Sequence, residues 1–152
     1  MTVCVRVQQE DFDVGAEVTA LREGDGRVGA VAVFVGMVRD VSEETNIVAM
    51  TLEHYPGMTE KSLIRIIEEA QRRFAILGAT VIHRVGTLRP LDQIVLIAVK
   101  SEHRGEAFDA CRFIIDYLKT EAPFWKQEVT PDGTRWVNAR VSDDAARSRW
   151  ES

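Results

Sequence analysis

Short apolar runs separated by turn residues dominate the chain and predict a protein rich in β-strands. The clearest run is Gly-Ala-Val-Ala-Val-Phe-Val-Gly at residues 29–36, a continuous apolar stretch bounded by glycines, as expected for a central strand. Weaker patterns predict further strands at residues 3–7, 47–55, 81–85, 94–99, 124–130 and 134–140. Pro131-Asp132-Gly133 joins the last two of these segments and predicts a hairpin.

Three segments instead repeat their apolar residues at the spacing of a helix face. Asp13 is a plausible cap for the first, Thr59 is one for the second, and the third follows Ser101. Pro123 ends the third helix, because its ring cannot continue a helix interior. With about seven strands and about three helices in mixed order, and with antiparallel hairpins, we expect an α+β fold with a mixed, largely antiparallel sheet.

The 152 residues show no internal repeat, low-complexity tract or linker, so we expect one domain over residues 1–140. Residues 141–152 are polar apart from Val141 and Trp150, and they predict a mobile tail. No stretch approaches the roughly 18 apolar residues of a membrane span, and the N-terminus lacks the apolar core of a signal peptide. We therefore expect a cytoplasmic protein that does not insert into membranes.

The net charge of -5 and the pI of about 5.3 argue against a general nucleic-acid-binding protein, which usually carries a basic face. Anions would therefore bind only at a local basic cluster. The glycine motifs of nucleotide-binding loops and of serine-hydrolase elbows are absent. Cys4 and Cys111 lack the spacing of a metal pair and are expected to be buried, inert thiols. His54, His83 and His103 also lack metal-ligand spacing, so we expect neither a metal nor a cofactor.

Basic side chains stand at the ends of several predicted elements, where the local structure does not obviously require them. These residues are Arg39, His103, Arg104, Lys119, Lys126 and Arg140. His103 and Arg104 open a predicted helix, where unpaired backbone N–H groups attract anions and a cation is unfavourable. A bound phosphate or carboxylate would compensate for that cation. An ion pair of Arg104 with Glu102 or Glu106 is the alternative, and the local sequence does not decide between the two.

Lys119 ends the third predicted helix, and Lys126 follows beyond Pro123. Taken singly, a lysine in a last helical turn complements the helix dipole, and a lysine in an alternating strand simply faces solvent. A helix end that folds back through Pro123 can bring the two ammonium groups together, where Phe124 and Trp125 would partly desolvate them and reduce their basicity. The local sequence therefore makes the lysine pair a candidate base or nucleophile.

A set of motifs spread along the chain matches one known family. Residues 116–128 read Asp-Tyr-Leu-Lys-Thr-Glu-Ala-Pro-Phe-Trp-Lys-Gln-Glu, and shorter motifs lie at residues 34–39, 53–58, 83–86, 101–104 and 132–137. Together with Arg140 they resemble the catalytic, or large, subunits of molybdopterin synthase over nearly the whole chain. Each shorter motif alone would be weak, and the combination is specific. Leu91 departs from the pattern, because many relatives have glycine at this turn.

The resemblance implies an enzyme of molybdenum cofactor biosynthesis, a sulfurtransferase that adds two sulfur atoms to a cyclic pyranopterin monophosphate and so makes molybdopterin. The sulfur would arrive as a thiocarboxylate on the C-terminal Gly-Gly of a small ubiquitin-like sulfur-carrier subunit. The resemblance also implies a homodimer with one small subunit at each end, which makes a heterotetramer. The fold would contain an α/β-hammerhead element.

The same resemblance assigns the site residues. Lys119 and Lys126 would be catalytic, near the point where the tail of the small subunit meets the pterin. Arg39, His103 and Arg104 would hold the pterin phosphate, because a planar guanidinium group matches phosphate oxygens. The full set of implied substrate contacts is Met37, Val38, Arg39, His103, Arg104, Gln127, Glu128 and Arg140.

The length of the third predicted helix constrains this site. Arg104 and Lys119 lie fifteen residues apart on the helix, which corresponds to about 22 Å. One small pterin cannot contact both ends of a straight helix of that length. We therefore predict a composite site, to which the opposite subunit of a dimer donates His103 and Arg104.

Two other functions fit parts of the sequence. A non-catalytic binding module would dock the extended tail of a partner by strand addition and would not need the lysine pair. A persulfide sulfurtransferase would need an exposed, activated cysteine, and neither Cys4 nor Cys111 is expected to be one.

Overall fold

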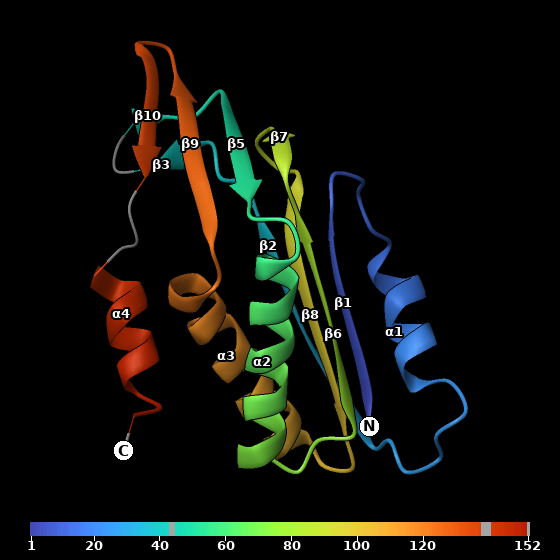
Figure 1. The fold of residues 1–152 in the computed structure, drawn as a ribbon. Coiled ribbons are helices and arrows are strands. Elements are labelled where there is room, and N and C mark those ends of the chain that lie inside the picture. Colours follow the sequence, from blue (N-terminus) through green and yellow to red (C-terminus); the bar gives the residue numbers. More distant parts are fainter. Residues whose placement is uncertain (43–44, 138–140, 152) are drawn as a thin grey trace.

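The chain forms two sheets that are flanked by helices (Figure 1). The structure is a computed structural model and describes residues 1–42, 45–137 and 141–151. Within these residues there are two four-stranded sheets, a two-stranded ribbon and four helices. None of these described helices has both the length and the apolar character that crossing a membrane requires.

The first sheet has the strand order β1-β6-β8-β2. Its strands are β1 (Thr2–Gln8), β6 (Gly78–Arg84), β8 (Gln93–Ser101) and β2 (Ala30–Met37). β1 pairs with β6 in parallel, and the other two pairings are antiparallel. The central strands β6 and β8 are buried along most of their length, which explains why their sequences are apolar runs rather than strict alternations.

Helices cover both faces of this first sheet. α2 (Met58–Arg73) and α3 (Arg104–Glu121) pack on one face, where they share a buried core with β2, β6 and β8. α1 (Val14–Arg22) lies on the other face, where Phe12 packs with Ile82 and Leu96 and Val14 adjoins them. Successive side chains of a strand point to opposite faces, so each central strand contributes to both cores.

The second sheet has the order β10-β9-β5-β7 and is antiparallel throughout. Its strands are β10 (Gly133–Val137), β9 (Phe124–Thr130), β5 (Ala49–His54) and β7 (Gly86–Leu88). In Figure 1 these strands lie beyond the upper ends of α2 and α3. A separate small core of Val38, Met50, Leu52, Val85 and Leu88 fills the inner side of this sheet.

The structure confirms the α+β prediction, because only the β1–β6 pair among the described strands is parallel. Other local predictions were incomplete. Gly57, not Thr59, is the N-cap of α2, and Thr59 is a fully buried residue of the first helical turn. The short strands β7, β3 (Val41–Ser42) and β4 (Thr45–Asn46) were not predicted.

The C-terminal segment was predicted to be a mobile tail, and the structure places a helix within it. Residues Val141–Ser148 form helix α4. Trp150 then packs edge-on against Phe74 and Phe113, with 5.6 Å between ring centroids in both pairs. Its indole Nε1 donates a hydrogen bond of 2.8 Å to Asp116 Oδ2. The ring contacts of Trp150, its bond to Asp116 and the bond from Arg73 Nη1 to the Trp150 carbonyl together hold the segment against α2 and α3.

Leu91 occupies the turn between β7 and β8. Its φ is 77°, and among the described residues it is the only non-glycine with a positive φ. The Leu91 N–H donates to the Val38 carbonyl, and the Val38 N–H donates to the Asp92 carbonyl. The turn is thus bonded to the chain just after β2. The left-handed backbone explains why glycine suits this position.

We expect Leu91→Gly to raise the free energy of unfolding by about 1 kcal/mol, because glycine adopts this backbone conformation without strain. The added conformational entropy of the unfolded chain offsets only part of this gain. Urea unfolding measures the difference. Leu91→Ala is the matched control, since it keeps a Cβ and gains nothing at this φ. A glycine variant no more stable than the alanine variant would contradict the explanation.

Candidate active site

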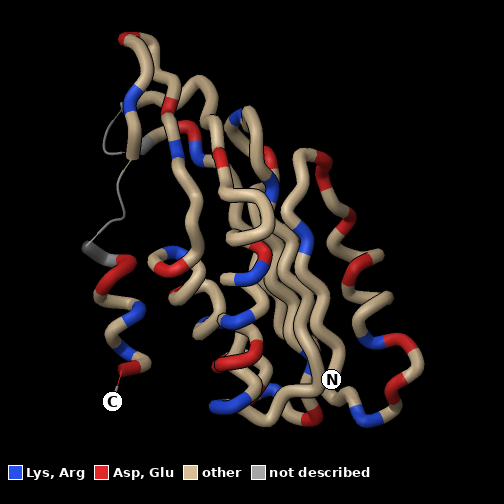
Figure 2. Tube along the Cα trace, in the orientation of Figure 1, with Lys and Arg blue, Asp and Glu red and all other residues tan. Residues whose placement is uncertain are grey.

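A cavity of about 390 Å³ lies where the end of α3 meets the two sheets. Its walls come from the segment after β2, from β5, from the end of β6, from the last turn of α3 and from β9. Arg39, Lys119 and Lys126 bring basic side chains to it, and Glu128 and Asp143 bring acidic ones. Figure 2 shows Lys and Arg spread among Asp and Glu along the trace. The cavity therefore gathers several cations of an acidic protein in one place.

The alternation of β9 decides which of its residues face the cavity. Phe124, Lys126 and Glu128 line it, as do Met50 and Leu52 of the neighbouring strand β5. Lys126 is directly opposite Leu52, and Glu128 is opposite Met50. Side chains two residues apart share a face of a strand, so this set is continuous across both strands.

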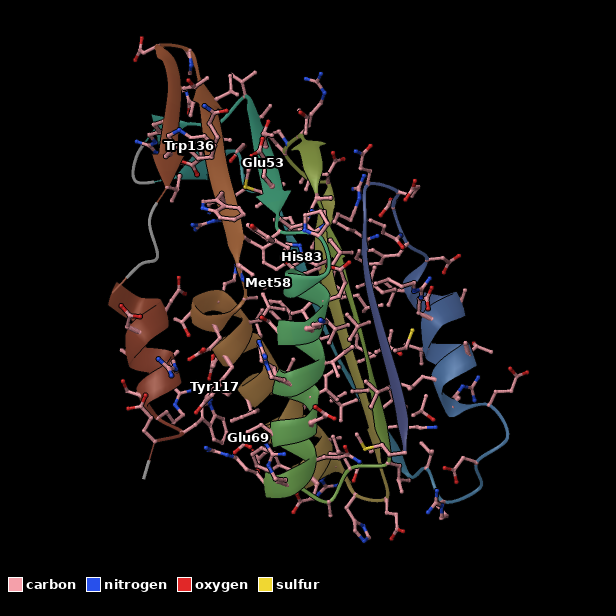
Figure 3. The ribbon with its side chains drawn as sticks, in the orientation of Figure 1. Glu53, Met58, Glu69, His83, Tyr117 and Trp136 are labelled. Carbon is pink, nitrogen blue, oxygen red and sulfur yellow. The ribbon has the colours of Figure 1, made fainter. Side chains whose placement is uncertain are left out.

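Gln127 lies on the opposite face of β9 from this cavity. It is opposite Thr51 in β5 and Trp136 in β10, and none of the three lines the cavity. Figure 3 shows Trp136 on the outer part of the second sheet. The structure therefore separates Gln127 from the other β9 residues that the resemblance had grouped with it, and a substrate contact by Gln127 stays a prediction.

The two lysines reach the same cavity from opposite sides of Pro123. Lys119 lies in the last turn of α3, which closes with the Ala122 N–H donating to the Leu118 carbonyl at 3.3 Å. Lys126 lies on β9 just beyond the proline. The sequence prediction that Pro123 folds the chain so as to bring these lysines together agrees with this arrangement. Their catalytic roles stay predictions.

A buried threonine holds this turn. The Thr59 hydroxyl donates to the Pro123 carbonyl at 3.1 Å and accepts from the Tyr55 N–H at 2.9 Å. Thr59 is 0% exposed, so neither group is within reach of competing water. The loop between β5 and α2 is thereby bonded to the point where α3 gives way to β9.

Glu128 is a buried acid with a specific partner. Glu128 is only 4% exposed. Arg135 lies opposite it on β10 and donates a hydrogen bond of 3.0 Å from Nε to Glu128 Oε1. Arg135 Nη2 approaches the same oxygen at 2.9 Å. A buried carboxylate requires such pairing. Much of the negative charge of Glu128 is therefore compensated outside the lysine pair.

The end of β2 and the two residues that follow it supply three predicted substrate contacts to the cavity wall. Met37, Val38 and Arg39 all line it, and the pairing of β2 with β8 shifts register between Gly36 and Met37. Such an irregularity redirects the following side chains. Val38 is buried, whereas Met37 and Arg39 are exposed. The exposed pair is thus accessible to a molecule that enters the cavity.

His103 and Arg104 lie at the other end of α3, and neither lines the cavity. Both are exposed, and His103 is the N-cap residue without a side-chain capping bond. Glu106 accepts from the Ala75 N–H, and among the described residues Arg104 makes no ion pair. One chain alone therefore does not bring His103 and Arg104 to the lysines. Arg140 lies outside the described residues.

His83 belongs to the cavity, although the sequence analysis considered it individually only as a metal ligand and found no supporting spacing. It lines the cavity near the end of β6, is 5% exposed, and stacks on Phe124 with 3.9 Å between ring centroids. The pKa of His83 is lowered to about 4, mainly because burial disfavours the charged imidazolium. The hydrogen bond to the Arg84 backbone raises the pKa, and the charges of Lys119 and His54 lower it. The available signal was its position where a central strand ends. The described residues contain no group of three potential metal-binding side chains.

Cys111 is buried in α3, as predicted, and Cys4 is half-buried. The Cys111 sulfur is 3.8 Å from the Ile97 carbonyl oxygen. Burial raises the pKa of this thiol to about 12, so it stays protonated near neutral pH. A protonated, enclosed thiol is a poor nucleophile.

The family model described as MoaE protein matches residues 7–121 of the chain. The chain belongs to this family. A relative from Ralstonia nicotianae, named molybdopterin synthase catalytic subunit, is 60% identical over 146 residues, which make up 96% of this chain and 83% of the relative. The solved molybdopterin biosynthesis MoaE protein from Burkholderia ambifaria is 56% identical with a TM-score of 0.85, and the match covers 100% of this chain and 99% of that one.

A more distant structure shares the MoaE fold. It is the protein–protein complex of subunits 1 and 2 of molybdopterin-converting factor from Helicobacter pylori, which is 20% identical with a TM-score of 0.73. The match covers 90% of this chain and 91% of that chain. The MoaE family match itself includes Arg39 and Lys119 and ends before Lys126, whereas the Burkholderia match spans the whole chain.

The buried histidine gives this MoaE protein a pH-dependent stability. Because the folded pKa of His83 is below its ordinary value of 6.5, the unfolded chain binds the proton better, and stability falls as pH drops from about 6.5 to about 4. The loss attributable to His83 is about 3 kcal/mol. His83→Phe keeps a ring beside Phe124 and cannot titrate, so its unfolding free energy should fall less over this range. Urea unfolding at several pH values tests this, and parallel curves for the two proteins would contradict it.

Proposed function

We propose that this chain is the catalytic subunit of a molybdopterin synthase, which converts a cyclic pyranopterin monophosphate into molybdopterin by inserting two sulfur atoms. The observation that carries the proposal is the cavity that Lys119 and Lys126 share with Arg39. The name of the Ralstonia relative, at 60% identity, supports the same activity.

The charge of the cavity suits the proposed reactants. The pterin carries a phosphate, and the sulfur donor is the C-terminal Gly-Gly thiocarboxylate of a small ubiquitin-like subunit, so both reactants are anions. A protein of net charge -5 attracts anions only where its cations are concentrated. The proposed assembly is a cytoplasmic heterotetramer, with a central homodimer and one small subunit at each end.

The two lysines supply the proposed chemistry. Lys119 either stabilises the negative charge that develops on the thiocarboxylate oxygen or attacks its carbon. Lys126 transfers the protons that opening of the cyclic phosphate and formation of the carbon–sulfur bonds require. Arg39 holds the phosphate beside them. The enclosed, protonated Cys111 disfavours a persulfide mechanism, which needs an accessible thiolate.

The phosphate site is proposed to be completed by a second copy of the chain. His103 and Arg104 open α3, and Lys119 closes it, at a separation of about 22 Å. Since neither His103 nor Arg104 lines the cavity of its own chain, the opposite subunit would donate both. Backbone N–H groups at the start of α3 would add to the attraction for phosphate.

Reconstitution with a thiocarboxylated small subunit and the cyclic pterin tests the lysine roles. We expect Lys119→Ala and Lys126→Ala each to lower kcat roughly 100-fold or more, because the site loses a positive charge that is placed where negative charge develops. Lys61→Ala is the matched control, since Lys61 is exposed on α2, and it should retain full activity. Full activity in both cavity variants would refute the proposal. Binding of the small subunit by the wild-type chain without turnover would indicate a docking module that acts beside another catalyst.

Mixed dimers test the composite site. A dimer of one Lys119→Ala chain and one Arg104→Ala chain has one doubly altered site and one intact site if Arg104 acts across the interface. We therefore expect the mixed dimer to recover about half of the activity, one site of two, while each variant alone stays impaired. Two tags, one on each variant, allow the mixed dimer to be purified before assay. No recovery in the purified mixed dimer would place Arg104 in the same subunit as Lys119.

A further inference from the structure

His83 is the buried polar group of the cavity to which the proposed reaction assigns no task. Its residue is 5% exposed and still lines the cavity. Figure 3 shows it where the second sheet meets the strands of the first. The ring lies nearly parallel to that of Phe124, at 20° between planes and 3.9 Å between centroids. The stack on Phe124 and the burial of His83 in β6 together restrict the orientation of the imidazole ring.

The hydrogen bond of the ring fixes its tautomer. Nδ1 is 2.8 Å from the carbonyl oxygen of Arg84. A carbonyl only accepts, so Nδ1 must carry the proton and donate it. A neutral imidazole has one N–H, and Nε2 is therefore a hydrogen-bond acceptor. The backbone of β6 thus determines that the histidine offers a lone pair rather than a proton.

The surroundings keep this acceptor uncharged. Burial first, and then the charges of Lys119 and His54, lower the pKa of His83 to about 4. The other charged groups that line the cavity are Arg39, Lys126, Glu128 and Asp143, and Glu128 is paired with Arg135. Near neutral pH, His83 is consequently a neutral acceptor in a cavity that holds several cations.

We propose that His83 is a positioning residue for Lys119: its Nε2 accepts a hydrogen bond from the Lys119 side-chain nitrogen and directs that nitrogen toward the reacting carbon–sulfur group. The catalytic part of this inference rests on the proposed sulfur-transfer function. The geometry supports it, because His83 and Lys119 line one cavity and Nε2 is the ring nitrogen left to accept. The charge of Lys119 also contributes to the lowered pKa of His83.

A neutral acceptor suits this task better than a carboxylate. A lysine has a long, mobile side chain, and one fixed hydrogen bond removes much of its freedom before the substrate arrives. A carboxylate would do the same but would strongly favour the ammonium form, which can neither attack a carbon nor accept a proton. A neutral imidazole orients the nitrogen with a much weaker preference for its charged form.

Three substitutions separate positioning from packing. His83→Phe keeps the stack on Phe124 and removes the acceptor. His83→Asn keeps a donor for the Arg84 carbonyl and also lacks an acceptor at the Nε2 position. His83→Gln places an amide oxygen within reach of that position and serves as the conservative rescue. All three are compared with wild type for folding before any assay, and the asparagine variant carries the test if the phenylalanine variant is unfolded.

Two measurements are made on each variant. The first is kcat and KM in the reconstituted synthase reaction. We expect kcat of the Phe and Asn variants to fall roughly tenfold or more with KM little changed, and that of the Gln variant to recover most of the loss. The second follows acylation of Lys119 in the isolated protein across pH, with Lys61 as the internal reference by peptide mass spectrometry. Loss of the acceptor should move the Lys119 profile to lower pH and leave Lys61 unchanged.

The outcomes are distinguishable from those of the main proposal. An unchanged Lys119 profile in both the Phe and Asn variants would overturn the inference whatever the enzyme does, because this readout does not depend on sulfur transfer. A shifted Lys119 profile with Lys119→Ala fully active would support the contact and refute the proposed function. Full kcat in the Phe variant, together with loss in the Asn and Gln variants, would show that the ring only packs, and would also overturn the inference.

Discussion

The hydrogen bond between the Thr59 hydroxyl and the Pro123 carbonyl is the constraint on which the rest of the site depends. Pro123 has no N–H and ends α3, so the chain direction beyond it must be set by other contacts. Thr59 is 0% exposed and bonds Pro123 to the loop between β5 and α2 at 3.1 Å. A buried carbonyl left without this donor would be costly. The bond therefore fixes the angle at which β9 leaves α3, and with it the meeting of Lys119 and Lys126.

The cavity beside this turn holds charges of both signs, with Lys119, Lys126 and Asp143 among them. Glu128 is compensated by Arg135 from the neighbouring strand, and His83 is held uncharged by burial. Arg39 adds a further cation from the segment after β2. An acidic protein thus concentrates several cations at one cavity, and its overall charge need not change for that.

Local pattern was sufficient to predict most elements. The strand from Phe124 to Thr130 and the end of α3 before Pro123 followed directly from alternation and from the proline. The alternation of β9 could also have separated Gln127 from Lys126, since parity alone places them on opposite faces. The helix in the C-terminal segment was not predicted, because the structure of this segment depends on contacts between residues far apart in the sequence. Trp150 is held by Asp116 and Arg73, which lie 34 and 77 residues away, and no local pattern reveals such partners.

The candidate site shows the same division. The lysine pair could be proposed from the sequence because Pro123 lies between its members, whereas the resemblance was needed to give the pair a role. His83 was missed as a cavity residue because a lone histidine in an apolar strand looks like an ordinary core residue, and only the packing of Phe124 across it shows otherwise. His103 and Arg104 cannot be joined to the cavity by any folding of a single straight α3.

The two-residue period of β9 limits how this segment can change in evolution. Lys126 and Glu128 face the cavity only because each is an even number of residues from Phe124, which is paired with His54 at the start of the strand. Inserting or deleting one residue between Pro123 and Lys126 would turn Trp125 or Gln127 inward and the lysine outward. Substitutions on the outer face of β9 can accumulate, while the number of residues between the proline and the lysine must stay constant.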